Sequence, residues 1–167
     1  NTQSGDGFFE AVAGWMKRHH NWEVRPEWHV KTPGVCVAIA NAIRAVTEPG
    51  DAVLINQPVY YPFSNIILQN GRKRVSSDLV CGEDDSYSID FQDFEQKIVE
   101  NQVKLFILCN PHNPVGRVWT KEELLRIGTI CREHQVLVFS DEIHFDFIWS
   151  GEHHVFQEVD SAFREFT

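Results

Sequence analysis

The side chains best suited to chemistry in this 167-residue sequence come directly after short apolar runs. Asp141 follows the run 136–140, and Asn113 lies between two prolines in the loop 110–117, which follows the run 105–109. A carboxylate at the end of a buried strand is costly to desolvate unless it meets a cation or a hydrogen-bond donor. We therefore expect Asp141 to pair with a protonated ring nitrogen, a metal ion or a neighbouring arginine, and the sequence leaves these alternatives open.

The loop around Asn113 is stiffened by proline on both sides. The residue before each proline is held extended, so Pro111 and Pro114 fix the direction in which Asn113 projects. An asparagine held in this way can donate a directed hydrogen bond, although a stiff turn is the alternative purpose of such a loop. Tyr60 and Tyr61 follow another apolar run and could either stack on a flat ring or pack in the core.

The segment Thr32-Pro-Gly-Val-Cys36 opens a predicted helix and is a candidate anion site. The N–H groups at the start of a helix lack intrahelical partners, and the helix dipole adds positive potential there. A plain Pro-Gly turn before a helix is the alternative. This segment alone does not distinguish the two.

A metal site in the acidic segment 141–146 is not favoured. In an extended chain Glu142, His144 and Asp146 share one face while Asp141 lies on the other, and no second ligand cluster is evident. A P-loop nucleotide site would require GxxxxGK[ST], which the sequence lacks. The histidine pairs at 19–20 and 153–154 flank polar segments and are predicted to lie on the surface.

The elements expected to position these residues alternate between helices and short apolar strands. Helices are predicted over 8–20, 35–47, 59–69, 90–101 and 121–134, and strands over 28–32, 52–55, 73–79, 104–109 and 136–140. Asp6 and Asp90 are expected N-caps, and Thr120 with Glu123 forms a capping box. This alternation predicts an α/β fold with a mostly parallel sheet covered on both faces. Ligands of such sheets bind at the carboxyl ends of the strands, where the residues above fall.

Composition narrows the possible partners. A net charge of -9 argues against nucleic-acid and membrane-surface binding, which need clustered basic residues. No apolar stretch approaches the ~18 residues of a membrane span. The cysteines are far apart, without a CxxC pair, which favours reduced thiols in the cytoplasm: Cys36, Cys81, Cys109 and Cys131. The start at Asn1, with a polar lead, suggests an internal segment of a longer protein.

Several ordered motifs together resemble the fold-type I pyridoxal-phosphate enzymes, the aminotransferase class I and II group. Within that group the chain looks like the MalY/PatB branch of cystathionine β-lyases, or C–S lyases. The resemblance runs from Thr2 to Asp160 and rests on Lys31-Thr-Pro-Gly-Val, Pro49-Gly-Asp, Gln57-Pro-Val-Tyr-Tyr-Pro-Phe63, Asn110-Pro-His-Asn-Pro-Val-Gly-Arg117 and Ser140-Asp-Glu-Ile-His144.

The resemblance implies a role for each motif in binding pyridoxal 5'-phosphate. Asn113 matches the asparagine that hydrogen-bonds the cofactor's phenolic oxygen, and Asp141 matches the aspartate paired with the pyridine nitrogen. Tyr60 matches the aromatic residue that stacks on the ring, with Tyr61 as the alternative. His144 stands where many aminotransferases have tyrosine, which favours the lyase branch.

The phosphate would be received by the backbone amides of Val35 and Cys36. The family's Schiff-base lysine follows the aspartate motif, whereas every lysine here precedes it: Lys17, Lys31, Lys73, Lys97, Lys104 and Lys121. The resemblance therefore implies no catalytic residue in this chain and a lysine beyond Thr167.

The chain would then be part of a large domain of three α/β/α layers, without the N-terminal arm and the C-terminal small domain. The strand predicted at 28–32 would lack its neighbour. The implied parent is a homodimeric β-lyase acting on small amino-acid substrates, with a class I/II aminotransferase and a non-catalytic binding module as alternatives.

Overall fold

The computed structural model describes residues 7–167, which separate by their contacts into two compact units, one ending at Thr32 and one running from Pro33 to Thr167. The first unit contains the helix α1 (Gly7–His20), which confirms the helix predicted at 8–20, and the short 3-10 helix η1 (Pro26–Trp28). Inside this unit the ring of Phe9 stacks on His29 at 4.8 Å. The expected cap, Asp6, lies outside the described residues.

The strand predicted at 28–32 is wrong. Residues 26–28 form η1, no strand is assigned to residues 29–32, and Val30 is 82% exposed. A strand is stabilised by hydrogen bonds to a neighbouring strand, and none of the strand pairs among residues 7–167 includes this segment. The apolar residues Trp28 and Val30 were therefore not sufficient to predict a strand here.

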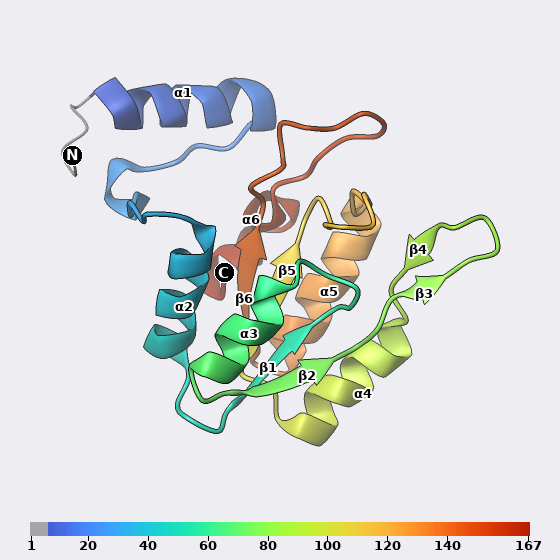
Figure 1. Ribbon diagram of the computed structural model, residues 1–167. Coiled ribbons are helices and arrows are strands. Elements are labelled where there is room, and N and C mark those ends of the chain that lie inside the picture. Colours follow the sequence, from blue (N-terminus) through green and yellow to red (C-terminus); the bar gives the residue numbers. More distant parts are fainter. Residues whose placement is uncertain (1–6) are drawn as a thin grey trace. The chain divides into compact units, whose positions relative to one another are not determined.

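The second unit is built on four parallel strands (Figure 1). Their order across the sheet is β2-β1-β5-β6, with bounds β1 (Ala52–Ile55), β2 (Lys73–Ser76), β5 (Leu105–Cys109) and β6 (Leu137–Asp141). The predicted strands at 52–55, 73–79, 104–109 and 136–140 are thus confirmed with small shifts at their ends. Cys109 is level with Asp141 in the register of β5 and β6, so the two carboxyl ends meet at one edge.

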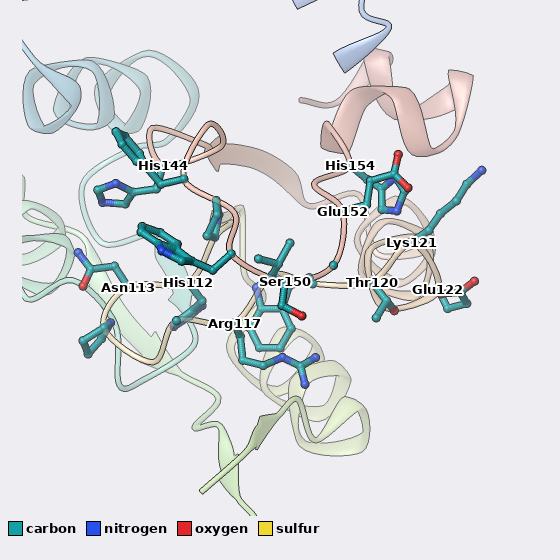
Figure 2. Close-up of a pocket in the computed structure, with 18 residues that line it drawn as sticks. His112, Asn113, Arg117, Thr120, Lys121, Glu122, His144, Ser150, Glu152 and His154 are labelled. Carbon is teal, nitrogen blue, oxygen red and sulfur yellow. The ribbon is translucent and has the colours of Figure 1, made fainter. Parts of the chain in front are cut away.

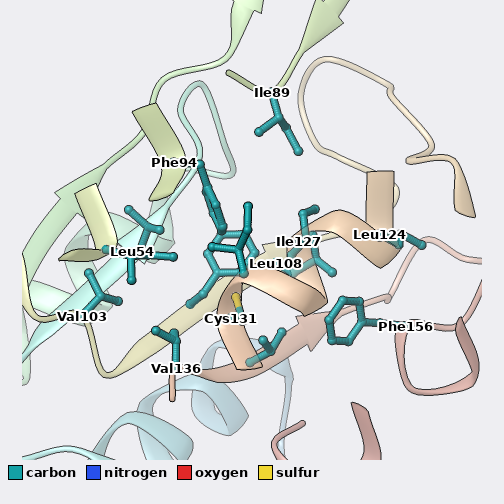
Figure 3. Packing of buried hydrophobic residues seen from close by; sticks show 14 of the residues in the cluster. Leu54, Ile89, Phe94, Val103, Leu108, Leu124, Ile127, Cys131, Val136 and Phe156 are labelled. Carbon is teal, nitrogen blue, oxygen red and sulfur yellow. The ribbon is translucent and has the colours of Figure 1, made fainter. Parts of the chain in front are cut away.

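Helices cover both faces of this sheet. α2 (Val35–Val46) and α3 (Pro62–Gln69) pack on one face, and α4 (Phe91–Asn101) and α5 (Lys121–Glu133) pack on the other. Successive strand residues point to opposite faces, so Val53 and Ile55 join the α2–α3 core while Leu54 joins the α4–α5 core (Figure 3). The α/β fold with a parallel sheet and three layers is confirmed.

The smaller elements were not predicted. β3 (Val80–Cys81) and β4 (Tyr87–Ser88) form an antiparallel pair, and α6 (Phe156–Val159) and η2 (Ser161–Glu165) follow β6. α3 begins at Pro62 rather than at residue 59 because proline suits the first turn of a helix, where its missing N–H leaves no bond unmade. No helix within residues 7–167 is long and apolar enough to cross a membrane.

The two helix caps predicted within residues 7–167 are confirmed. The side chain of Asp90 accepts hydrogen bonds from the N–H groups of Gln92 and Asp93 at 3.0 and 3.1 Å. In the capping box the N–H of Glu123 donates to the hydroxyl of Thr120 at 3.2 Å, and the N–H of Thr120 donates to the carboxylate of Glu123 at 2.8 Å. These caps fix where the helices begin, and hence where the loops before them end.

Replacing Gly128 by alanine should destabilise the protein, although alanine is the better helix former by about 1 kcal/mol. A Cβ at Gly128 would lie 2.1 Å from Cζ and 2.2 Å from Cε2 of Phe163, so the helix and the ring must separate. Overpacking of this kind typically costs about 1–3 kcal/mol, which outweighs the helix gain. Denaturant unfolding should show a lower midpoint, and Phe163→Leu should reduce the loss; a higher midpoint for Gly128→Ala would contradict the argument.

Candidate active site

Segments that follow β1, β5 and β6 come together at the carboxyl edge of the sheet. The N–H of Asn110, the first residue after β5, donates to the backbone oxygen of Asp141 at 3.0 Å. Nε2 of His112 lies 2.9 Å from the backbone oxygen of Pro58, which follows β1. The loop 110–117 is therefore bonded to both neighbouring segments.

Asp141 is a buried carboxyl group at the end of β6, with 7% of its surface exposed. Burial raises its pKa above the ordinary value, while the N–H of Ile143 and the charge of His144 act in the opposite direction. The N–H of Ile143 donates to its Oδ1 at 3.2 Å. None of the ion pairs described in residues 7–167 involves Asp141.

Two of the three partners considered for Asp141 are not supplied by these residues. Within the described part of the chain no arginine pairs with it, and no three His, Cys, Asp or Glu side chains gather as a metal-binding group. A buried carboxylate of this kind fits a positively charged ring nitrogen that carries a proton.

Tyr60 and Cys36 lie in contact near Asp141. The neighbouring Cys36 is the largest cause that raises the pKa of Tyr60, and burial and the charge of Asp141 act in the same direction. The ring of Tyr60 meets Phe63 edge-on at 5.9 Å, which fixes it from the α3 side. Tyr60 is 37% exposed and Tyr61 75%, so each presents an open surface.

Val35 and Cys36 are the first two residues of α2, after the N-cap Gly34. The N–H groups of Val37 and Ala38 both donate to the oxygen of Gly34 at 3.1 Å. The first amides of a helix precede this hydrogen-bonded ladder and can donate to an anion. The contact of Cys36 with Tyr60 brings this helix start to the same edge of the sheet as Asp141.

Asn113 and His144 line a pocket of about 970 Å³ (Figure 2). The N–H of Asn113 donates to Sγ of Cys109 at 3.5 Å. Burial raises the pKa of Cys109 to about 12, so this thiol is protonated at neutral pH. His144 connects the pocket to Asp141, whose pKa its charge lowers.

The rest of the pocket has an aromatic wall and a charged end. The wall contains Trp119, Phe147 and Trp149, of which the last two stack on each other at 6.4 Å. Figure 2 places Asn113 and His144 at one end of the view and Lys121 at the other. The charged side chains of the lining are Arg117, Lys121, Glu122 and Glu152, and three histidines also line the pocket: His112, His144 and His154. Val35, Cys36, Tyr60 and Asp141 do not line this pocket.

The prediction that His153 lies on the surface is wrong. His153 is 9% exposed, and its Nε2 lies 2.7 Å from Oε2 of Glu142. Oε1 of Glu142 accepts hydrogen bonds from the hydroxyl of Ser140 at 2.6 Å and from the N–H of Phe156 at 3.1 Å. Glu142 thus holds both ends of the loop that carries His144. A polar neighbourhood in the sequence cannot reveal such a partner 11 residues away.

His112 is a second residue whose part in the site the sequence reasoning missed. It is 2% exposed and bonded to Pro58, and it immediately precedes Asn113. Its place between the same two prolines, Pro111 and Pro114, was the available signal, because a side chain in so rigid a loop has a fixed direction as well.

Residues 2–163 match the family described as aminotransferase class I and II. The chain belongs to this family. Among the relatives of this chain, cystathionine beta-lyase PatB of Bacillus subtilis (strain 168) is 48% identical over 145 residues, which cover 87% of this chain and 37% of PatB. Protein MalY of Escherichia coli (strain K12) is 33% identical over 150 residues, covering 90% and 38%.

A solved structure agrees closely in fold. Cystalysin from Treponema denticola, whose structure contains pyridoxal 5'-phosphate, is 41% identical with a TM-score of 0.94, over 99% of this chain and 42% of that one. The predicted resemblance to the family is thus confirmed. The chain spans about two fifths of the length of these relatives.

Proposed function

We propose that the whole protein is a pyridoxal-phosphate-dependent carbon–sulfur β-lyase that converts cystathionine or cysteine-type substrates to a thiol, pyruvate and ammonia. The identity of 48% with cystathionine beta-lyase PatB supports the reaction class. The observation that best supports pyridoxal phosphate as the cofactor is the burial of Asp141 without a lysine or arginine partner among residues 7–167. A protonated pyridine nitrogen supplies the cation that this carboxylate needs.

Pyridoxal phosphate, when bound, supplies an electron sink for the negative charge that develops at the substrate's α-carbon. The carboxylate of Asp141 accepts a hydrogen bond from the ring nitrogen and holds the proton there. Burial raises the pKa of Asp141, and a positively charged ring nitrogen beside the carboxylate would lower it again. Asn113 would donate a hydrogen bond to the phenolic oxygen, and Tyr60 would offer its ring for stacking.

The remaining assigned residues hold the ends of the cofactor. The amides of Val35 and Cys36 receive the phosphate, favoured by the positive end of the α2 dipole. His144 lies beside Asn113 at the pocket, where it is supported by the contacts of Glu142. The Schiff-base lysine is assigned to the part of the protein beyond Thr167, so the present chain binds cofactor groups but does not catalyse.

We assign the pocket beside Asn113 to the substrate's side chain. It is lined by Asn113 and His144, two of the residues assigned to the cofactor, and it has an aromatic wall. Residues 1–167 form part of the large domain, and the arm and the small domain belong to the rest of the protein. The protein is assigned as a cytoplasmic homodimer, with the first assignment supported by the four free thiols.

Turnover of cystathionine by the whole protein separates this function from its rivals. We expect pyruvate and a thiol to form with pyridoxal phosphate and without any amino acceptor. A class I/II aminotransferase shares the same cofactor contacts but would form keto acid only when an acceptor is added. A protein that binds the cofactor and turns over neither substrate mixture would be a binding module, and that result would defeat the proposal.

A further inference from the structure

The ring of His112 is buried and held in one orientation. Nε2 lies 2.9 Å from the backbone oxygen of Pro58, and because a carbonyl oxygen only accepts, Nε2 carries the proton of this bond. Burial lowers the pKa of His112, partly offset by the carbonyl groups around the ring, so the ring is neutral at neutral pH. The edge of the ring also meets Trp119 at 5.4 Å and 78°.

The backbone of His112 is held as firmly as its ring. Its N–H donates to the oxygen of Arg117 at 2.7 Å, and its oxygen accepts from the N–H of Gly116 at 2.8 Å. These two bonds close the loop 110–117 on itself. A change in the ring of His112 is therefore transmitted to the adjoining residue, Asn113, rather than absorbed by a loose chain.

One hydrogen bond thus connects the two segments that carry Asn113 and Tyr60. His112 directly precedes Asn113, and Pro58 stands two residues before Tyr60. The two segments follow different strands, β5 and β1, and are 54 residues apart in sequence. Their separation at the site depends on this contact as well as on the sheet.

We propose that His112 is a positioning residue, whose Nε2–H bond to Pro58 sets the placement of Asn113 relative to Tyr60. This inference rests on the proposed function, in which Asn113 donates to the phenolic oxygen of pyridoxal phosphate. A hydrogen bond to an ionised oxygen favours the ionised form and lowers its pKa. Loss of the His112 bond relaxes Asn113 and raises the spectroscopic pKa of the bound cofactor.

The test is a pH titration of the visible absorption of the cofactor in the whole holoprotein. Asn113→Ala should raise the spectroscopic pKa by about one unit or more, the size expected for one hydrogen bond to a charged group. His112→Phe keeps a ring but has no donor, and should raise this pKa in the same direction by a smaller amount. His112→Gln carries an amide donor near the position of Nε2 and should restore the wild-type value.

The double variant His112→Phe/Asn113→Ala shows whether His112 changes the spectroscopic pKa by positioning Asn113 or by an effect of its own on the cofactor. Because His112 acts through Asn113, the double variant should titrate like Asn113→Ala alone. His112→Asn provides a second variant if His112→Phe does not fold, since its amide lies near Nδ1 and leaves Pro58 without a donor. It should behave like His112→Phe.

Ile98→Ala in α4 is the matched control for lost stability. Ile98 is 2% exposed and packs in the α4–α5 core, so its removal should lower the melting temperature and leave the titration unchanged. The inference is overturned if His112→Phe is less stable but titrates like the wild type, or if the double variant shows additive shifts. Either result leaves the proposed function in place. A titration that Asn113→Ala does not move overturns the proposed role of Asn113 together with the inference.

Discussion

Replacing Asp141 by asparagine in the whole protein should lower kcat by about a hundredfold or more, comparable with removing one preorganised electrostatic group from an active site. Asparagine keeps the size of the side chain but carries no charge to hold a proton on the ring nitrogen. The electron sink of the cofactor weakens in consequence. Steady-state pyruvate formation with cystathionine measures the loss, and Asp146→Asn, an exposed carboxylate on the same loop, is the control.

The same substitution should make the cofactor-free protein more stable at neutral pH. Burial raises the pKa of Asp141 in the folded state above its ordinary value of 3.8. Because the pKa is higher in the folded state, the protonated acid adds to the free energy of unfolding. This contribution is complete below the ordinary pKa and is lost as the pH rises through the folded-state value. Asparagine resembles the protonated acid and avoids this loss, so the variant's advantage should appear above pH 3.8 and vanish below it.

Melting temperatures with and without pyridoxal phosphate complete this test. The cofactor should stabilise the wild type more than Asp141→Asn, because only the carboxylate gains from the charged ring nitrogen and tighter binding gives the larger stabilisation. Equal stabilisation of both proteins, or a variant that melts lower than the wild type at neutral pH without cofactor, would contradict the role of Asp141.

Local signals in the sequence were sufficient to predict most strands of the sheet and the helices that cover it. Every residue of β5 is buried, as its unbroken apolar run indicated, and Asp90 and Thr120 cap the helices they precede. Such signals depend on neighbouring residues alone. The segment 28–32, in which only Trp28 and Val30 are apolar, was also predicted to be a strand but forms none. Strand formation depends on a partner that is remote in sequence.

The candidate site likewise has features that a single segment predicts and features that depend on contacts between distant segments. The rule that ligands bind at the carboxyl ends of strands was enough to select Tyr60, Asn113 and Asp141. It could not foresee that Cys36 contacts Tyr60, or that His112 reaches Pro58, because these contacts join segments 24 and 54 residues apart. Candidate residues could therefore be named one segment at a time, while the contacts between segments required the fold.

Trp119 connects the site loop to the hydrophobic core, and Trp119→Ala should have the largest effect on stability. Its side chain is fully buried, its Nε1–H donates to the oxygen of Cys109 at 3.0 Å, and its backbone N–H donates to Oδ1 of Asn110 at 3.2 Å. Arg117 lies over the ring at 4.9 Å. Removing so large a side chain leaves a cavity that costs about 3–5 kcal/mol of the free energy of unfolding.

Trp119→Phe separates packing from hydrogen bonding at this position. Phenylalanine fills most of the space but leaves the oxygen of Cys109 without its donor, a loss of about 1–3 kcal/mol for a buried acceptor. We therefore expect denaturant unfolding to rank the wild type above Trp119→Phe, and Trp119→Ala lowest. Trp119→Ala should also weaken cofactor binding, because the ring supports His112 next to Asn113. An alanine variant as stable as the phenylalanine variant would mean that the loop collapses into the space, and that its geometry does not depend on the ring of Trp119.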